Sequence, residues 1–147
     1  MEKPIPLLRS FLFAPGNHPR RVEKALTLDT DAVILDLEDA VATAEKVATR
    51  DAITAALRQP RTGLLYVRVN AADTEFCCGD LVAVVRPGLD GIILPKVESP
   101  ATLTTIDWLL HQIEHRDAAE RSGGLSGHAR RSCSRIAAIF SKRRCAR

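Results

Sequence analysis

The chain has 147 residues, of which 46% are hydrophobic and 27% charged, and a formal net charge of +3. This length is typical of one domain, and the hydrophobic share is enough for a buried core, which excludes wholesale disorder. No apolar stretch reaches the ~20 residues of a membrane-spanning helix, and the first residues lack a signal-peptide layout. The four cysteines form no Cys-x-x-Cys pair, which argues against a zinc site. We therefore expect a soluble cytoplasmic protein.

Apolar runs that end in turn or acidic signals predict four buried strands, at residues 8–13, 32–35, 64–69 and 91–94. Each is followed by a segment with helical periodicity, at residues 20–28, 44–58, 80–86 and 101–116. Four βα units in a row predict an α/β fold with a parallel sheet and helices outside it. An open doubly wound sheet and a (β/α)₈ barrel both satisfy this pattern. Because a full barrel takes ~250 residues, the spacing fits about half of one.

Charge is distributed unevenly about residue 120. Residues 1–120 hold 13 basic and all 18 acidic residues, whereas residues 121–147 hold eight basic residues and no acid. Only one apolar cluster, residues 136–140, interrupts this segment, so we expect no fifth βα unit and an irregular basic tail. The tail can be interpreted as flexible, or as binding nucleic acid or a membrane surface, although it lacks interleaved aromatic residues. We favour a third interpretation, a reading-frame change that has replaced the rest of a longer domain.

Functional groups of parallel α/β folds gather at the carboxyl ends of the strands, where the βα loops meet. The second predicted strand ends in three acids, Asp36, Glu38 and Asp39. Crowded carboxylates need a compensating cation, so this cluster predicts metal ligation, support of a metal site or proton transfer. The alternative is that the acids only favour the first turn of the following helix, but three in four positions exceed what one helix start requires.

Other strands deliver further candidates to the same rim. Arg68 lies between Val67 and Val69, so alternation points its side chain to the opposite face, which in a barrel is the interior. Its planar guanidinium suits the carboxylate of a substrate, or a structural ion pair with Glu38 or Asp39, and both remain open. The Pro15-Gly16 turn could present backbone N–H groups to an anion. Lys96 and Glu98 follow the fourth strand, where they either join the rim or simply open the next helix.

Four segments, RSFLFAPGNHPRRVEKAL, DAVILDLEDAV, YVRVNAADT and DGIILPKVES, in this order and spacing, resemble the citrate lyase β-subunit-like family of the HpcH/HpaI aldolase group. The resemblance covers about residues 9–112 and implies the amino-terminal half of a (β/α)₈ TIM barrel. It implies a magnesium-dependent carbon–carbon lyase that acts on CoA or acyl-carrier thioesters of the citryl or malyl class and releases a 2-oxo acid. Full-length relatives are expected to be homo-oligomers, with no membrane or nucleic-acid partner.

Position by position, the resemblance implies that Arg68 contacts the oxo-acid carboxylate and that the Glu38–Asp39 loop, which follows Asp36, supports a metal site or acid–base steps. Pro15 and Gly16 match a loop near the substrate, and Lys96 and Glu98 match the loop after strand four. The family's magnesium ligands come from strands five and six, so we expect no metal ligand here.

Residues 1–120 are thus interpreted as an amino-terminal half-barrel, and residues 121–147 as a basic tail unlike the family. The expected product is a truncated, inactive form of the lyase. The alternative from another class is a non-catalytic half-barrel interaction protein, which pairs its open strand edges with another chain and binds an acidic partner through the tail.

Overall fold

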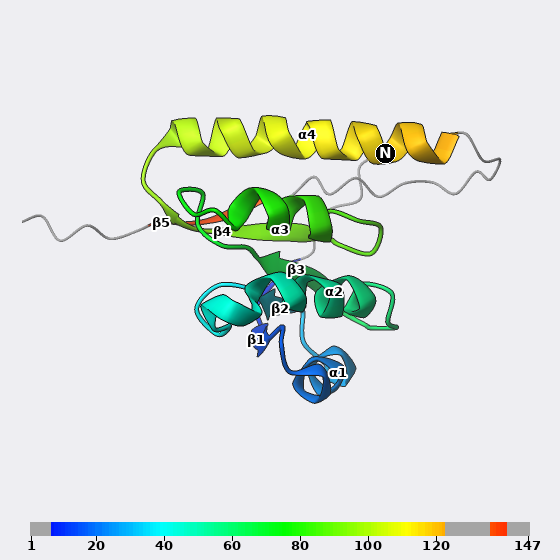
Figure 1. Cartoon of the computed structure of the whole chain (residues 1–147). Coiled ribbons are helices and arrows are strands. Elements are labelled where there is room, and N and C mark those ends of the chain that lie inside the picture. The colour runs from blue at the N-terminus through cyan, green and yellow to red at the C-terminus, as the bar shows by residue number, and fades with distance from the viewer. Residues whose placement is uncertain (1–6, 123–135, 141–147) are drawn as a thin grey trace, which may run out of the picture.

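A computed structural model describes residues 7–122 and 136–140 of the chain, with side chains described as far as residue 116. Strands and helices alternate along these residues (Figure 1). In chain order the elements are β1 (Phe11–Pro15), α1 (Pro19–Thr27), β2 (Ala32–Asp36), the short 3₁₀ helix η1 (Thr43–Glu45), α2 (Lys46–Ala56), β3 (Leu64–Arg68), α3 (Cys77–Val84), β4 (Gly91–Val97), α4 (Pro100–Ser122) and β5 (Ile136–Phe140).

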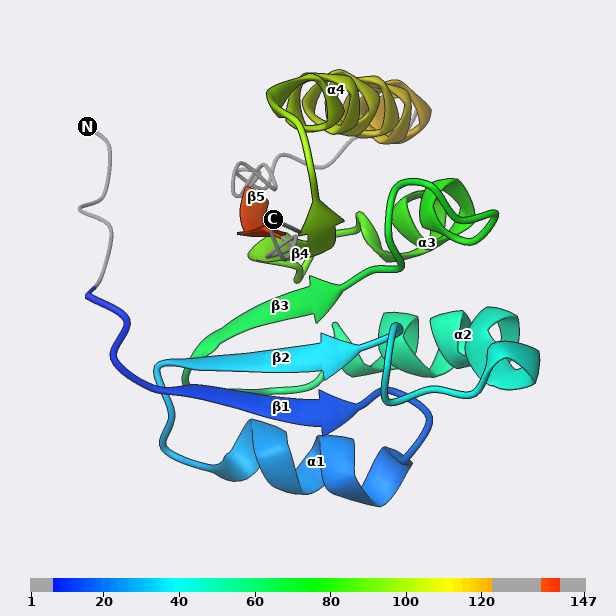
Figure 2. The ribbon, with the colours of Figure 1, turned by 90° about the vertical axis from the view of Figure 1, so that its left-hand side faces the viewer.

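The strands form one parallel sheet in the order β1-β2-β3-β4-β5. Figure 2 shows β1, β2 and β3 side by side and pointing the same way, with helices along the outside. A doubly wound sheet reverses its strand order at a switch point, whereas this order runs without reversal, as in a barrel. The prediction of a partial (β/α)₈ barrel is confirmed, and the open-sheet alternative is wrong.

The expectation of an irregular segment after residue 120 is wrong for residues 136–140. These residues form β5, which pairs in parallel with β4 so that Ile136 lies opposite Ile92. An apolar run with isoleucines suits a pleated, half-buried surface, and it covers an edge of β4 that would otherwise expose unpaired backbone groups. Helix α4 also continues past residue 120 to Ser122. The rest of the predicted tail lies outside the described residues.

The first strand begins three residues later than predicted, at Phe11 instead of Leu8. Asp31 explains this shift, because its Oδ2 accepts hydrogen bonds of 2.8 Å from the backbone N–H groups of both Arg9 and Ser10. The side chain of Asp31 thus binds the backbone of residues 9 and 10, and the strand begins only after them. The hydrogen bond from Arg9, together with those from Ser10, lowers the pKa of Asp31.

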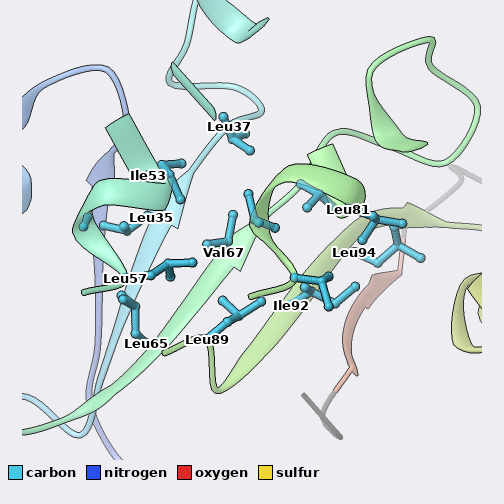
Figure 3. Close-up of a cluster of buried hydrophobic side chains, with 14 of the residues drawn as sticks. Leu35, Leu37, Ile53, Leu57, Leu65, Val67, Leu81, Leu89, Ile92 and Leu94 are labelled. Atoms are coloured by element: carbon cyan, nitrogen blue, oxygen red, sulfur yellow. The ribbon is translucent and has the colours of Figure 1, made fainter. Parts of the chain in front are cut away.

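Alternation along the strands separates two apolar layers. One face packs against the helices and forms the main core, of which Leu35, Leu65, Val67 and Ile92 are fully buried members (Figure 3). The opposite face, which is the interior of a barrel, carries a smaller buried cluster of Ala32, Ile34, Tyr66 and Ile93. Among the helices of the described residues, none has the length and hydropathy needed to span a membrane.

Leu65→Ala tests the main core. Leu65 has no exposed surface, so the truncation should lower the free energy of unfolding by about 2–5 kcal/mol through lost burial and the cavity left behind. Urea unfolding followed by circular dichroism measures the change. Val47→Ala, at a side chain that is 56% exposed on α2, is the control and should change stability by less than about 0.5 kcal/mol. Equal losses of stability in Leu65→Ala and Val47→Ala would show that this layer is not the main core.

Candidate active site

The candidate site lies at the carboxyl ends of β2, β3 and β4. Asp36 is the last residue of β2 and Arg68 is the last residue of β3, and the parallel register places them opposite each other. Lys96 lies near the end of β4. The predicted convergence at one rim is therefore present for these three strands, because parallel strands deliver their terminal side chains to the same edge.

Arg68 and Asp36 form a bidentate ion pair. Arg68 Nε lies 2.8 Å from Asp36 Oδ1, and Arg68 Nη2 lies 2.6 Å from Asp36 Oδ2. The same carboxylate accepts backbone hydrogen bonds from Glu38 and Ala40, at 2.8 and 3.0 Å. Burial raises the pKa of Asp36, but the hydrogen bonds from Arg68 and the backbone outweigh burial and hold that pKa below its usual value. The hydrogen bond with Asp36 raises the pKa of Arg68 in turn.

Two cations flank the remaining two carboxylates of the cluster. Arg68 Nη1 lies 3.3 Å from Glu38 Oε2 and 3.6 Å from Asp39 Oδ2. Lys96 Nζ lies 2.7 Å from Glu38 Oε1 and 3.8 Å from Asp39 Oδ1, and its hydrogen bond with Glu38 raises the pKa of Lys96. The Glu38 side chain is 6% exposed and that of Asp39 66%. Glu38 is thus buried between the two cations, whereas Asp39 lies at the surface with longer contacts to both.

The structural ion pair expected for Arg68 is therefore present, and its principal partner is Asp36 instead of Glu38 or Asp39. The bidentate geometry occupies Nε and Nη2, which leaves Nη1 as the edge that faces the rim. The ring of Phe13 lies 5.2 Å from Arg68 Cζ, so an aromatic face covers part of the guanidinium. Five sequence-predicted residues are thus brought together: Asp36, Glu38, Asp39, Arg68 and Lys96.

Lys96 adopts an uncommon backbone conformation. Among the described residues it is the one non-glycine residue with positive φ, at 53°, and it lies where the pairing of β4 with β5 shifts register. A left-handed conformation costs a residue with a side chain about 1–2 kcal/mol. The irregularity interrupts strand alternation, so that Lys96 is exposed between the buried residues Pro95 and Val97 while its ammonium meets Glu38.

Pro15 and Gly16 support the rim from β1. The Gly16 N–H donates to the backbone oxygen of Asp36 at 3.0 Å, so it is not free to bind an anion in the way the sequence suggested. A Cβ on Gly16 would lie 2.7 Å from Ile53 Cδ1 and 2.9 Å from the Asp36 oxygen, which explains why glycine occupies this turn. Glu98 lies beside the cluster, lining a cavity of about 550 Å³ with Asp73, Lys96 and Ser99.

Sequence reasoning missed two buried polar residues beneath the rim, Lys46 and Asn70. Lys46 opens α2, where a lysine on an amphipathic helix normally indicates a solvated face, yet its side chain is buried. Asn70 was visible only as the polar residue that follows β3. No pattern in a single sequence distinguishes a buried lysine from an exposed one, because the difference depends on which loops fold over it.

The described residues do not by themselves fit a magnesium ion. They contain no group of three or more His, Cys, Asp or Glu side chains that could hold a metal. Magnesium requires several oxygen ligands, but the oxygens of Asp36 and Glu38 face Arg68 and Lys96. Strand β5 occupies the fifth position of the sheet with the sequence IAAIF and brings no acid to it.

Comparison with known proteins agrees with this arrangement. The profile of the HpcH/HpaI aldolase/citrate lyase family matches residues 9–139, so the chain belongs to this family. The match passes residue 120 and reaches residue 139, within β5. The resemblance inferred from the four segments is confirmed.

Individual relatives give the same result. The citrate lyase subunit beta of Leuconostoc mesenteroides subsp. cremoris is 40% identical over 110 residues, which are 74% of this chain and 36% of that protein. A (3S)-malyl-CoA thioesterase of Cereibacter sphaeroides is 39% identical over 107 residues, or 71% of this chain and 38% of that protein. The chain thus spans little more than a third of these relatives.

A solved structure shows a similar fold. The citrate lyase beta subunit from M. tuberculosis, complexed with oxaloacetate and magnesium, is 38% identical, with a TM-score of 0.57 over 65% of this chain and 42% of that one. Relatives of this chain therefore include citrate lyase beta subunits and a malyl-CoA thioesterase, and one of the citrate lyase beta subunits binds oxaloacetate and magnesium.

Asp36→Asn tests the central ion pair. Its folded pKa lies below the ordinary value, so the stability it contributes is present above its unfolded pKa of about 3.9 and is lost as the pH falls through the folded pKa. The variant should lose about 2 kcal/mol at pH 7, and its difference from the wild type should shrink below about pH 4. Urea titrations between pH 3 and 7 measure this. Asp51→Asn, at an exposed position of α2, should show neither effect.

Proposed function

We propose that the described residues form one wall of the active site of a carbon–carbon lyase that acts on CoA or acyl-carrier thioesters of the malyl or citryl class and releases a 2-oxo acid. The observation that carries this proposal is the orientation of Arg68. Asp36 holds two guanidinium nitrogens in a fixed plane, and the third faces the rim beside Lys96. Such a pair of cations suits the carboxylate of a 2-oxo acid.

Asp39 is the internal group that such a carboxylate would replace. It is 66% exposed and lies 3.6 Å from Arg68 Nη1 and 3.8 Å from Lys96 Nζ, longer than good ion-pair distances. Replacing one carboxylate by another leaves the charge of the cluster unchanged, so the exchange needs no new counter-charge. Asp36 and Glu38, which are buried, would stay in place.

Glu38 and Asp39 are acids at this rim that can take up or return a proton. Cleavage removes the proton from the β-hydroxyl group, converts its carbon to the carbonyl of the 2-oxo acid and leaves the electron pair of the broken bond on the enolate of the acyl thioester, which is then protonated. We propose that one of these two acids supports the proton transfers. We expect the family's magnesium to be held by groups outside the described residues.

Arg68→Met and Asp39→Asn test the carboxylate site. Arg68→Met should weaken pyruvate binding to the full chain by about tenfold or more, since a charge-assisted hydrogen bond is worth about 1.5–3 kcal/mol. Asp39→Asn should tighten binding several-fold, because it removes the competing carboxylate. Titration with pyruvate followed by isothermal calorimetry measures both changes in affinity.

Arg61→Met is the matched control. Arg61 also pairs with an aspartate, Asp90, but before β3, at the opposite end of the sheet, so pyruvate binding should not change. For cleavage of malyl-CoA or citryl-CoA with added Mg²⁺, we expect no turnover from this chain alone, because no acid follows Glu120. Weaker pyruvate binding by Asp39→Asn would contradict the proposed exchange.

Self-association is a second candidate function, and one observation favours it. Phe11 and Phe13, on β1, are 51% and 48% exposed, and among the described residues β1 pairs with β2 alone. An apolar strand with an open edge is a surface on which another copy can pack.

Phe11→Ser should therefore shift the chain from associated species toward monomer. Light scattering across a concentration series measures the mass. Trp108→Ser, which removes an aromatic residue that is 61% exposed on α4, should leave the mass unchanged. A wild-type chain that is monomeric at every concentration would exclude this candidate.

A further inference from the structure

Lys46 is a buried lysine that the proposed chemistry does not use. Its side chain lies beneath the rim, and the residue is 8% exposed. Lys46 Nζ donates to the backbone oxygens of Leu37 and Glu38, at 2.9 and 2.6 Å, and to Asn70 Oδ1 at 2.6 Å. An ammonium has three donors, so all of them are used. Each of these acceptors is a neutral oxygen, and none is a carboxylate.

Burying an ammonium among neutral oxygens is costly compared with leaving it in water. The contacts of Lys46 show which groups its burial holds in place. The Glu38 N–H donates to Asp36 Oδ1, and the Glu38 carbonyl accepts from Lys46. The main chain of Glu38 is thus held on both sides, which directs its carboxylate between Arg68 and Lys96.

Asn70 connects Lys46 to the next loop. Its Nδ2 donates to the Leu37 oxygen at 3.1 Å and to Asp80 Oδ2 at 2.7 Å, and its backbone N–H also donates to Asp80 Oδ2. Asp80, which has no exposed surface, pairs through Oδ1 with Arg50 Nε at 2.9 Å. The loops after β2 and β3 are therefore joined by one buried hydrogen-bond network, and Lys46 stands at the end of that network nearest to Glu38.

Charge gives Lys46 a second role. The ion-paired groups of the rim are three carboxylates, Asp36, Glu38 and Asp39, and two cations, Arg68 and Lys96, which leaves one negative charge in excess. Asp73 and Glu98, which line the adjoining cavity with Lys96, add further negative charge. The Lys46 ammonium offsets that excess from below, without occupying the face of the rim that a ligand would enter. Asp80 and Arg50 cancel each other in the same network.

We propose that Lys46 is a positioning residue: it fixes the Glu38 carboxylate through the Glu38 main chain and places a positive charge beneath the carboxylates of the rim. The functional importance of Glu38 rests on the proposed function, but the effect of Lys46 on Glu38 does not. Lys46 is not expected to touch the substrate.

Lys46→Met in the full chain tests this role, because methionine keeps much of the side-chain length and removes the ammonium. The ¹³C signal of the Glu38 carboxyl carbon, recorded at pH 7, should shift and broaden as the carboxylate leaves its fixed place between Arg68 and Lys96. Amide hydrogen exchange at Glu38 and Asp39 should become at least about tenfold faster as the loop loosens. Lys46→Arg should restore much of the wild-type carboxyl signal, because it restores the charge and the hydrogen-bond donors.

Thr49→Val is the matched control. Thr49 lies about one turn further along α2 and is also buried, but its hydroxyl donates to the Glu45 backbone oxygen and does not reach the loop after β2. This variant should lose stability without changing the Glu38 carboxyl signal. An unchanged Glu38 carboxyl signal in Lys46→Met, with a stability loss like that of Thr49→Val, would overturn the proposal.

If Lys46→Met does not fold, a measurement on the wild-type chain tests the same role of Lys46. The ammonium protons of Lys46 should exchange slowly enough with water to be seen by ¹⁵N NMR and should show couplings to the carbonyl carbons of Leu37 and Glu38. Rapid exchange without these couplings would overturn the proposal. Failure of pyruvate to bind would affect the proposed function alone, because no experiment on Lys46 needs a ligand.

Discussion

The ion pair between Asp36 and Arg68 is the interaction on which the rest of the site depends. It joins the ends of β2 and β3 across a fixed parallel register, and it sets the plane of the guanidinium. Because two of the three nitrogens are occupied by Asp36, the third can face only the rim. Asp36 also holds the backbone of the loop that carries Glu38, so one carboxylate determines where both the cationic and the acidic groups of the site lie.

Much of this arrangement was predictable from the sequence. Apolar runs and helical periodicity were enough to place the first four βα units, and the rule that strand ends meet at one edge was enough to group Asp36, Arg68 and Lys96. The partner of Arg68 was not predictable, since Asp36, Glu38 and Asp39 are equivalent by residue type and only the register chooses among them. β5 was missed because a five-residue apolar cluster among basic residues gives little periodicity, and its pairing depends on the edge of β4.

The buried layer beneath the rim shows a different limit of sequence reasoning. Lys46, Asn70 and Asp80 lie on three separate elements or loops and meet only after the chain has folded. Lysine, asparagine and aspartate are ordinary at solvent-facing positions, so only the folded structure shows that these three side chains are buried in one network. The network also adds to the order of the acidic loop after β2: besides the buried Leu37 side chain, its backbone oxygens are bound by the Lys46 ammonium.

The left-handed backbone of Lys96 lowers the stability of the fold, while its ammonium is part of the charged rim. Glycine would adopt this φ of 53° at little cost, so exchanging the lysine for glycine would relieve the backbone while removing the ammonium that holds Glu38. The same exchange would leave the buried Glu38 carboxylate with one cation fewer, which is itself destabilising. Position 96 therefore joins two opposing contributions to stability, a strained backbone and an ion pair, in one residue.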